Sequence, residues 1–194
     1  MTDTNFSVTE LNQLRCHLLL VDDEEEITKS LFRQFRKSCD VFIAHNAEQA
    51  LQILNNQEIH VILCDQRLPN LTGTQFLSSI KESYPHIVLL LLTGYPDINV
   101  LIEGINGSHI YRYLPKPWDI NEVNHAVQQA FEKYRLHLTN ALLLKELAQA
   151  NQELEERVRN RTRQVESLNA ALQERTLQAE YNARGKALFL DNVS

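Results

Sequence analysis

The chain is short of residues that break helices and has no long hydrophobic run. It contains five glycines and five prolines in 194 residues, and none of either between Asp119 and Gly185. No apolar run approaches the ~18–20 residues that span a bilayer. The first 14 residues are polar and lack the apolar core of a signal peptide. We therefore expect a cytoplasmic protein with no membrane partner.

Cysteine is also scarce, and acidic residues outnumber basic ones, 25 to 19. The three cysteines, Cys16, Cys39 and Cys64, are odd in number and lack the spacing of a metal site, so they favour buried free thiols in a reducing compartment. The net charge of −6, with its acidic excess in residues 1–134, argues against a general nucleic-acid or membrane-surface binder. No helix-turn-helix segment is visible. The arginines near 157–163 are interpreted as a solvated helix face, so we expect no direct binding of nucleic acid.

Short apolar runs alternate along the chain with segments of helical period. The spacing of apolar residues predicts helices near 27–35, 47–54, 76–80 and 98–105, and a fifth after Trp118 with Asp119 as N-cap. Such alternation predicts βαβ units around a parallel sheet. The runs lack alternating polar residues, which indicates strands buried on both faces. Five strands are predicted, near residues 16–22, 40–44, 60–65, 87–92 and 110–114.

The last helix has no visible end, and its composition shifts to Leu, Ala, Glu, Gln and Arg. A helical pattern of more than 25 residues without a cap suggests a coiled coil. Leu at d, with Val or Asn at a, is typical of parallel two-stranded coils, and a single Asn at a, here Asn151, fixes register. The predicted core is Leu144, Leu147, Asn151, Leu154, Val158, Val165, Leu168 and Leu172.

The coiled-coil register is open after Val158. Arg161 and Arg175 fall at d positions, which weakens the seam, and a frame shifted through Thr162, Asn169 and Thr176 competes there. The alternative is one long solvated helix, but a single helix cannot bury its own apolar stripe.

Charged and hydroxyl side chains follow four of the predicted strands. Asp22-Asp23 follow the first strand, and Asp65 ends the third. Thr93 follows the fourth strand and Lys116 the fifth. Ligands of an open parallel sheet bind outside the carboxyl ends of its strands, so these groups should converge. Three carboxylates, a hydroxyl and a lysine in one place predict a phosphoacceptor site.

This chemistry requires a metal ion, because a carboxylate and a phosphoryl donor repel each other. The oxygen ligands of Asp22, Asp23 and Asp65 suit Mg²⁺ or Mn²⁺. Lys116 can pair with Asp65 and later with a phosphoryl oxygen. Pro117 is a candidate for a cis bond that aims the lysine. Read alone, the acidic pair at residues 22–23 also fits a simple helix N-terminus.

In this order, the residues resemble the receiver domain of bacterial two-component response regulators over residues 15–134. The resemblance implies a doubly wound, flavodoxin-like sheet and makes Asp65 the phosphorylated residue. It implies that the backbone carbonyl of Arg67 joins the acidic pair in binding Mg²⁺, that Thr93 is the switch hydroxyl, and that Tyr113 is the aromatic ring that reorients. It further implies a cognate histidine kinase or phosphotransfer protein as donor, with self-catalysed transfer and hydrolysis. Such a chain is not a stand-alone enzyme.

The helical extension is similar to the signalling helices that join sensory and output modules. We therefore expect a tail at 1–14, a receiver at 15–134, a dimeric coiled-coil signalling helix at 135–190, and at 191–194 the start of a missing output module. The first alternative is the receiver part of a hybrid histidine kinase with its catalytic region beyond Ser194. The second is a purely structural dimer with Asp65 silent. A haloacid-dehalogenase-type phosphatase is disfavoured, because Arg67 stands where that family has a second Asp. The seven histidines are interpreted as surface or turn residues.

Overall fold

The computed structural model describes residues 13–94 and 110–191, with side chains up to residue 182. The helix expected near 98–105 lies outside these residues, as do most of the expected tail and the last residues of the chain. The chain divides into two units, Met1–Leu142 and Leu143–Ser194. No helix among the described residues is long and apolar enough to cross a membrane.

The first unit contains the predicted five-stranded parallel sheet, in the order β2-β1-β3-β4-β5. The strand order reverses direction at β1, and the crevice at such a point is where open α/β sheets bind ligands. The last two strands run farther than predicted, so Thr93 and Lys116 lie within the paired ends of strands rather than after them. The strands are β1 Cys16–Val21, β2 Cys39–Ala44, β3 Val61–Asp65, β4 Val88–Gly94 and β5 Arg112–Lys116.

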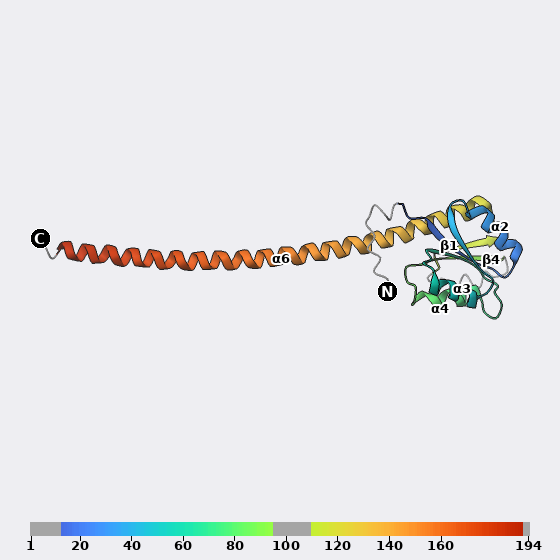
Figure 1. Ribbon diagram of the computed structural model, residues 1–194, viewed down its shortest axis with the longest axis horizontal. Helices are drawn as coiled ribbons and strands as arrows, with labels where there is room; N and C mark the ends of the chain where they lie inside the picture. The colour runs from blue at the N-terminus through green and yellow to red at the C-terminus, as the bar shows by residue number, and fades with distance from the viewer. Residues whose placement is uncertain (1–12, 95–109, 192–194) are drawn as a thin grey trace. The chain divides into compact units, whose positions relative to one another are not determined.

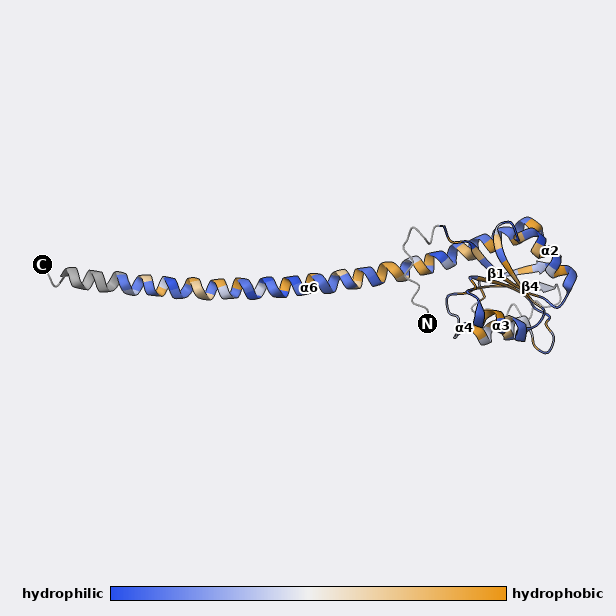
Figure 2. Ribbon diagram, in the orientation of Figure 1, coloured by the Kyte–Doolittle hydropathy of each residue, from blue (hydrophilic) through white to orange (hydrophobic). Residues whose placement is uncertain are grey.

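Helices cover both faces of the sheet, which confirms the doubly wound α/β fold (Figure 1). One face packs against α2, Glu25–Phe35, and the first turns of α6, Ile120–Asp191. The other face packs against α3, Ala47–Asn56, and α4, Gly73–Lys81. Because both faces are covered, the strands are mainly apolar and form the most hydrophobic layer of this unit (Figure 2).

Helix α6 begins where the sequence predicted. The carboxylate of Asp119 accepts hydrogen bonds from the backbone N–H groups of Asn121 and Glu122, at 2.8 and 3.1 Å, which satisfies donors that a helix start leaves unpaired. Val123, Ala126, Val127, Ala130 and Tyr134 then pack into the core. The packing continues past the predicted boundary at residue 134, because Leu138 also contacts this core.

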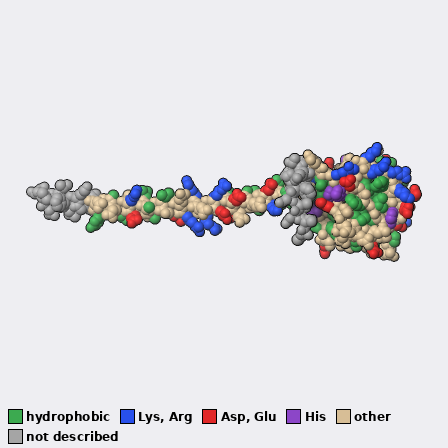
Figure 3. Space-filling model, viewed as in Figure 1, with side chains coloured by type: hydrophobic (Ala, Val, Ile, Leu, Met, Phe, Trp, Pro, Cys, Tyr) green, Lys and Arg blue, Asp and Glu red, His purple; other side chains and the backbone are tan. Residues whose placement is uncertain are grey.

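The second unit is the continuation of α6, and every side chain from Leu143 to Asn182 is exposed. Hydrophobic side chains recur along its surface between charged ones (Figure 3). The exposed apolar residues include Leu144, Leu147, Leu154, Val158, Val165, Leu168 and Leu172, all members of the predicted coiled-coil core. Their pairing with a second chain stays a prediction.

The prediction that the histidines lie at the surface or in turns is wrong for His60. Its side chain is fully buried, and its ring stacks on His17, Phe131 and Tyr134 at centroid distances of 4.7, 5.5 and 4.5 Å. The backbone N–H of His17 donates to its Nδ1 at 3.0 Å. Two of the ring partners come from α6, far away in the sequence, so local sequence gave no sign of them. His109 lies outside the described residues.

Candidate functional site

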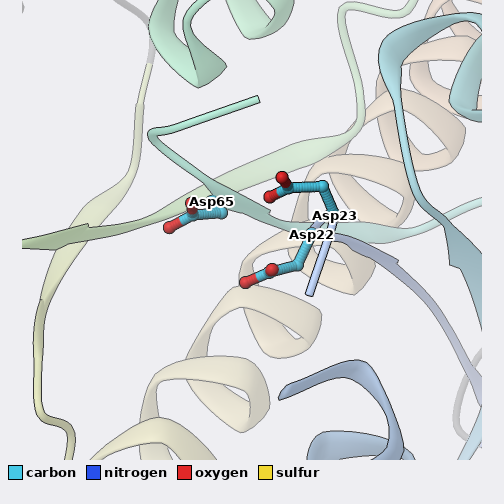
Figure 4. Close-up of side chains that lie close together, drawn as sticks. All are labelled: Asp22, Asp23 and Asp65. Atoms are coloured by element: carbon cyan, nitrogen blue, oxygen red, sulfur yellow. The ribbon is translucent and has the colours of Figure 1, made fainter. Parts of the chain in front are cut away.

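Three carboxylates meet at the carboxyl ends of β1 and β3. Asp22 and Asp23 follow β1, and Asp65 is the last residue of β3, its direct neighbour in the sheet. One carboxylate oxygen from each residue lies within 4.8 Å of the other two. Figure 4 shows the three groups gathered beyond the ends of their strands. The structure thus brings together the acidic residues that the sequence predicted would converge.

Lys116, at the end of β5, joins this cluster. Its ammonium lies 2.8 Å from Oδ1 of Asp65 and 3.2 Å from Oδ2 of Asp22. Both carboxylates are nearly fully buried, whereas Asp23 is exposed. Burial by itself would lower the pKa of Lys116, but the bonds and charges of the two aspartates outweigh it and raise that pKa. Burial is also the main reason that the pKa of Asp22 is raised. One ammonium therefore compensates two carboxylates that are removed from water.

Backbone N–H groups hold the remaining oxygens of the two buried carboxylates. Oδ2 of Asp65 accepts from the N–H of Arg67 at 3.0 Å, and Oδ1 of Asp22 accepts from the N–H of Glu24 at 2.9 Å. Glu24 is the N-cap of α2 and makes no side-chain capping bond of its own. Asp22 thus also supports the helix start, which was the alternative interpretation of the acidic pair. The two roles are compatible, because its Oδ2 faces Lys116.

Thr93 lies on β4, which pairs with β3, and Tyr113 lies on β5, the next strand beyond β4. Thr93 is buried, and its hydroxyl donates to the carbonyl of Gly94 at 3.4 Å. Tyr113 is half-buried on β5 and packs against the core beneath α3 and α4. The peptide bond between Lys116 and Pro117 is cis. The side chain of Lys116 also lies 5.8 Å from the ring centroid of Trp118, the only tryptophan.

Two residues that brace Asp65 were missed by sequence reasoning. Gly73 opens α4, and a β-carbon at this position would overlap the carbonyl oxygen of Asp65. Gln66 is buried, and its side-chain oxygen accepts from the backbone N–H and hydroxyl of Thr74, at 3.2 and 2.7 Å. The start of α4 is therefore pressed against the acceptor loop. One signal was available, since Thr72 and Gln75 form a capping box that marks this helix start.

The donor set fits a divalent cation with oxygen preference. Three carboxylates are hard ligands, and an exposed residue such as Asp23 leaves room for the waters that Mg²⁺ keeps. Among the described residues, the ammonium of Lys116 pairs with Asp65 and Asp22, and the three carboxylates gathered within 4.8 Å attract a cation.

Comparison with known proteins decides the family. The model of the response regulator receiver domain matches residues 18–128. The chain belongs to that family. The hydrogenase transcriptional regulatory protein HoxA of Cupriavidus necator is 39% identical to this receiver chain over 115 residues, which is 59% of the chain and 24% of HoxA. The DNA-binding transcriptional regulator NtrC of Escherichia coli is 29% identical over 119 residues, covering 60% and 25% of the two chains.

A solved structure shows the same receiver fold. The signal receiver domain of an HD domain-containing protein from Pseudomonas fluorescens superposes with a TM-score of 0.60 at 37% identity, covering 62% of this chain and 98% of that one. The chain spans about a quarter of the length of the curated relatives it matches.

Proposed function

We propose that Asp65 accepts a phosphoryl group from a histidine kinase or a phosphotransfer protein. The observation that carries this proposal is the ion-paired cluster in which Lys116 bridges Asp65 and Asp22 beside Asp23. Membership of the receiver family supports it. Such a cluster is costly to bury for stability alone, because desolvation offsets much of the attraction between the charges.

In the proposed reaction, a carboxylate oxygen of Asp65 attacks the phosphorus of a phosphohistidine, and the bond from phosphorus to nitrogen breaks. A Mg²⁺ or Mn²⁺ ion held by Asp22, Asp23, Asp65 and the Arg67 carbonyl would neutralise the repulsion between the two anions. Lys116 then exchanges its bond to Asp65 for one to a phosphoryl oxygen. Thr93 donates its hydroxyl to the new group, and Tyr113 reorients into the space that Thr93 leaves. This local change shifts the balance between two arrangements of the last strand and the last helices of the receiver.

The second part of the proposal is that α6 carries the state to an output module as a parallel dimeric coiled coil. The exposed heptad of apolar residues beyond Leu143 supports dimerisation, because a helix with an uncovered apolar stripe is stabilised by a partner. Two of the relatives are named as transcriptional regulators. The kind of output module, whether transcriptional or, as in the hybrid-kinase alternative, catalytic, depends on sequence beyond the receiver.

The test is phosphorylation by acetyl phosphate in the presence of Mg²⁺, followed by intact mass. Wild type should gain one phosphoryl group, and Asp65→Asn should gain none. Asp40→Asn is the matched control, because Asp40 is exposed at the start of β2 and pairs with Arg15 rather than with Lys116. An adduct that persists in Asp65→Asn, or none on folded wild type, would contradict the proposed acceptor.

Binding of the ion has a separate readout. Trp118 is the only tryptophan and lies beside Lys116, so its fluorescence should report changes in the charge cluster. Titration with Mg²⁺ should change the fluorescence of wild type, and Asp23→Asn should weaken the response without unfolding the protein, because Asp23 is exposed. An unchanged titration in that variant would remove Asp23 from the ligand set.

A further inference from the structure

Two of the three cysteines lie side by side at the end of the sheet where β1 and β2 begin. Cys16 and Cys39 are the first residues of β1 and β2 and are direct partners in the parallel pairing. Both are free thiols, and each is only 5% exposed. Neighbouring strands lie about 4.8 Å apart, and disulfides join residues whose Cα atoms are about 4.4–6.8 Å apart. The backbone separation therefore suits a covalent link.

The two thiols already interact. The interaction between the side chains of Cys16 and Cys39 is the main cause that lowers the pKa of Cys39 to about 7 and raises the pKa of Cys16. The hydroxyl of Ser38 lies 3.8 Å from the sulfur of Cys39, and the positive charge of Arg15 acts in the same direction. Hydrogen bonds and a nearby cation are the conditions that make a cysteine nucleophilic. Cys39 thus has the features of an attacking thiolate, and Cys16 those of a resolving thiol.

A small reagent has a way to reach the pair. A pocket of about 220 Å³ is lined by both cysteines together with Arg15 and Ser38. Its far wall is formed by Asn124, Val127, Gln128 and Phe131 of α6. Cys64 provides a natural contrast, because it is completely buried in β3. The three cysteines are therefore one neighbouring pair beside a pocket and one enclosed thiol.

We propose that Cys16 and Cys39 form a redox-sensitive pair that closes to an intrachain disulfide when hydrogen peroxide reaches this pocket. The Cys39 thiolate attacks one peroxide oxygen, the O–O bond breaks, and the leaving hydroxide takes a proton to form water. The sulfur of Cys16 then attacks the sulfenic acid on Cys39, the S–O bond breaks, and a second water leaves with the Cys16 proton. The two thiols lose two electrons, and the peroxide is reduced to water. A cytosolic thiol reductant reverses the bond, as is usual for intracellular disulfides of this kind.

The test is treatment of the folded full chain with hydrogen peroxide, followed by alkylation and peptide mapping. We expect loss of two hydrogens and a peptide that links Cys16 to Cys39, with Cys64 still alkylated after unfolding. Trypsin alone leaves Cys39 and Cys64 in one peptide, because no Lys or Arg lies between residues 38 and 66; a glutamate-specific protease separates them at Glu48 and Glu58. Reduction with dithiothreitol should restore all three thiols.

Two variants separate the roles of the thiols. Cys16→Ser should stop at a sulfenic acid on Cys39 that dimedone traps, and Cys39→Ser should leave Cys16 unmodified. In wild type at pH 7, Cys39 should be alkylated at least tenfold faster than Cys64, because a thiol with a pKa of about 7 is roughly half ionised there. Equal alkylation of Cys39 and Cys64, a link that includes Cys64, or an intact thiol pair after peroxide on protein with native circular dichroism would each overturn the proposal.

Discussion

The two units of this protein differ in the exposure of their apolar residues. The first unit encloses them, and the second leaves them in contact with solvent. In the first unit, the sheet is enclosed between two helical layers, and strand residues such as Leu19, Leu20 and Ile62 have no exposed surface. In the second unit, the apolar residues of α6 are exposed, as the charged ones are. Both units have regular secondary structure and are rich in leucine. Regular secondary structure alone therefore does not show where the stabilising contacts come from.

The difference concerns which contacts each unit needs in order to be stable. Burial of a leucine stabilises a fold by about 1.5–3 kcal/mol, and the receiver obtains this within one chain. In the proposed dimer, the helix beyond Leu143 obtains this burial from a second chain, so its stability should depend on protein concentration. The receiver should unfold at the same temperature at any dilution.

The largest expected effect comes from a charge in the predicted seam. Leu154→Lys places two ammonium groups at a d position of the dimer, and loss of two buried leucines should weaken dimerisation by about 3–6 kcal/mol, or on the order of 10²- to 10⁴-fold in Kd. Sedimentation equilibrium measures the dissociation constant of the dimer. Leu177→Lys is the matched control, because Leu177 is at least as exposed as Leu154 in one chain but lies outside both candidate frames. Equal effects of the two changes would contradict the predicted seam.

A change at Gly73 should act on the receiver alone. Gly73→Ala forces a β-carbon against the carbonyl of Asp65, and overpacking of this kind costs about 1–3 kcal/mol. Urea unfolding of the receiver should register the loss, and phosphorylation of Asp65 should slow. Ser78→Ala, at an exposed position of the same helix, should change neither quantity. A stable Gly73→Ala variant would mean that α4 can move away from the acceptor loop.

Acid should also destabilise the receiver and spare the helix. Burial lowers the pKa of His60 from 6.5 to about 4. Between pH 4 and pH 6.5 the unfolded chain binds more protons than the folded one. The stability that the neutral His60 side chain contributes is therefore complete above about pH 6.5 and is lost as the pH falls toward 4. From about pH 7.5 to about pH 5 the loss is about 2 kcal/mol. His60→Phe should show a smaller pH dependence in urea unfolding, whereas a change at exposed His86, to Gln, should not.

The smallest effect is expected from the charges of the second unit. Arg157 and Glu153 lie 4.0 Å apart with both side chains well exposed, and exposed pairs contribute little because water screens them. Glu153→Gln should leave the thermal transition of the helix unchanged within error. A clear loss of stability would place this pair inside the dimer contact and revise the predicted register.

Much of the fold and of the charge cluster was predictable from sequence. The cluster was predictable because parallel strands deliver their carboxyl ends to one edge, so the order of apolar runs located Asp22, Asp65 and Lys116 together without coordinates. The bracing by Gly73 was not predictable, since it depends on how closely a helix approaches a backbone carbonyl. The same holds for His60 and for the Cys16–Cys39 pair, which depend on strand register and on partners far away in the chain.

The order of the strands along the chain also determines when the charge cluster can first form during synthesis. Asp22 and Asp65 belong to the first and third strands, but Lys116 belongs to the last, at the edge of the sheet. Non-local contacts of this kind form late, because loop closure must precede them. A chain emerging from the ribosome carries both buried aspartates well before it carries their cation. We therefore expect the acceptor to be completed only when synthesis has passed β5, which protects nascent chains from premature phosphorylation.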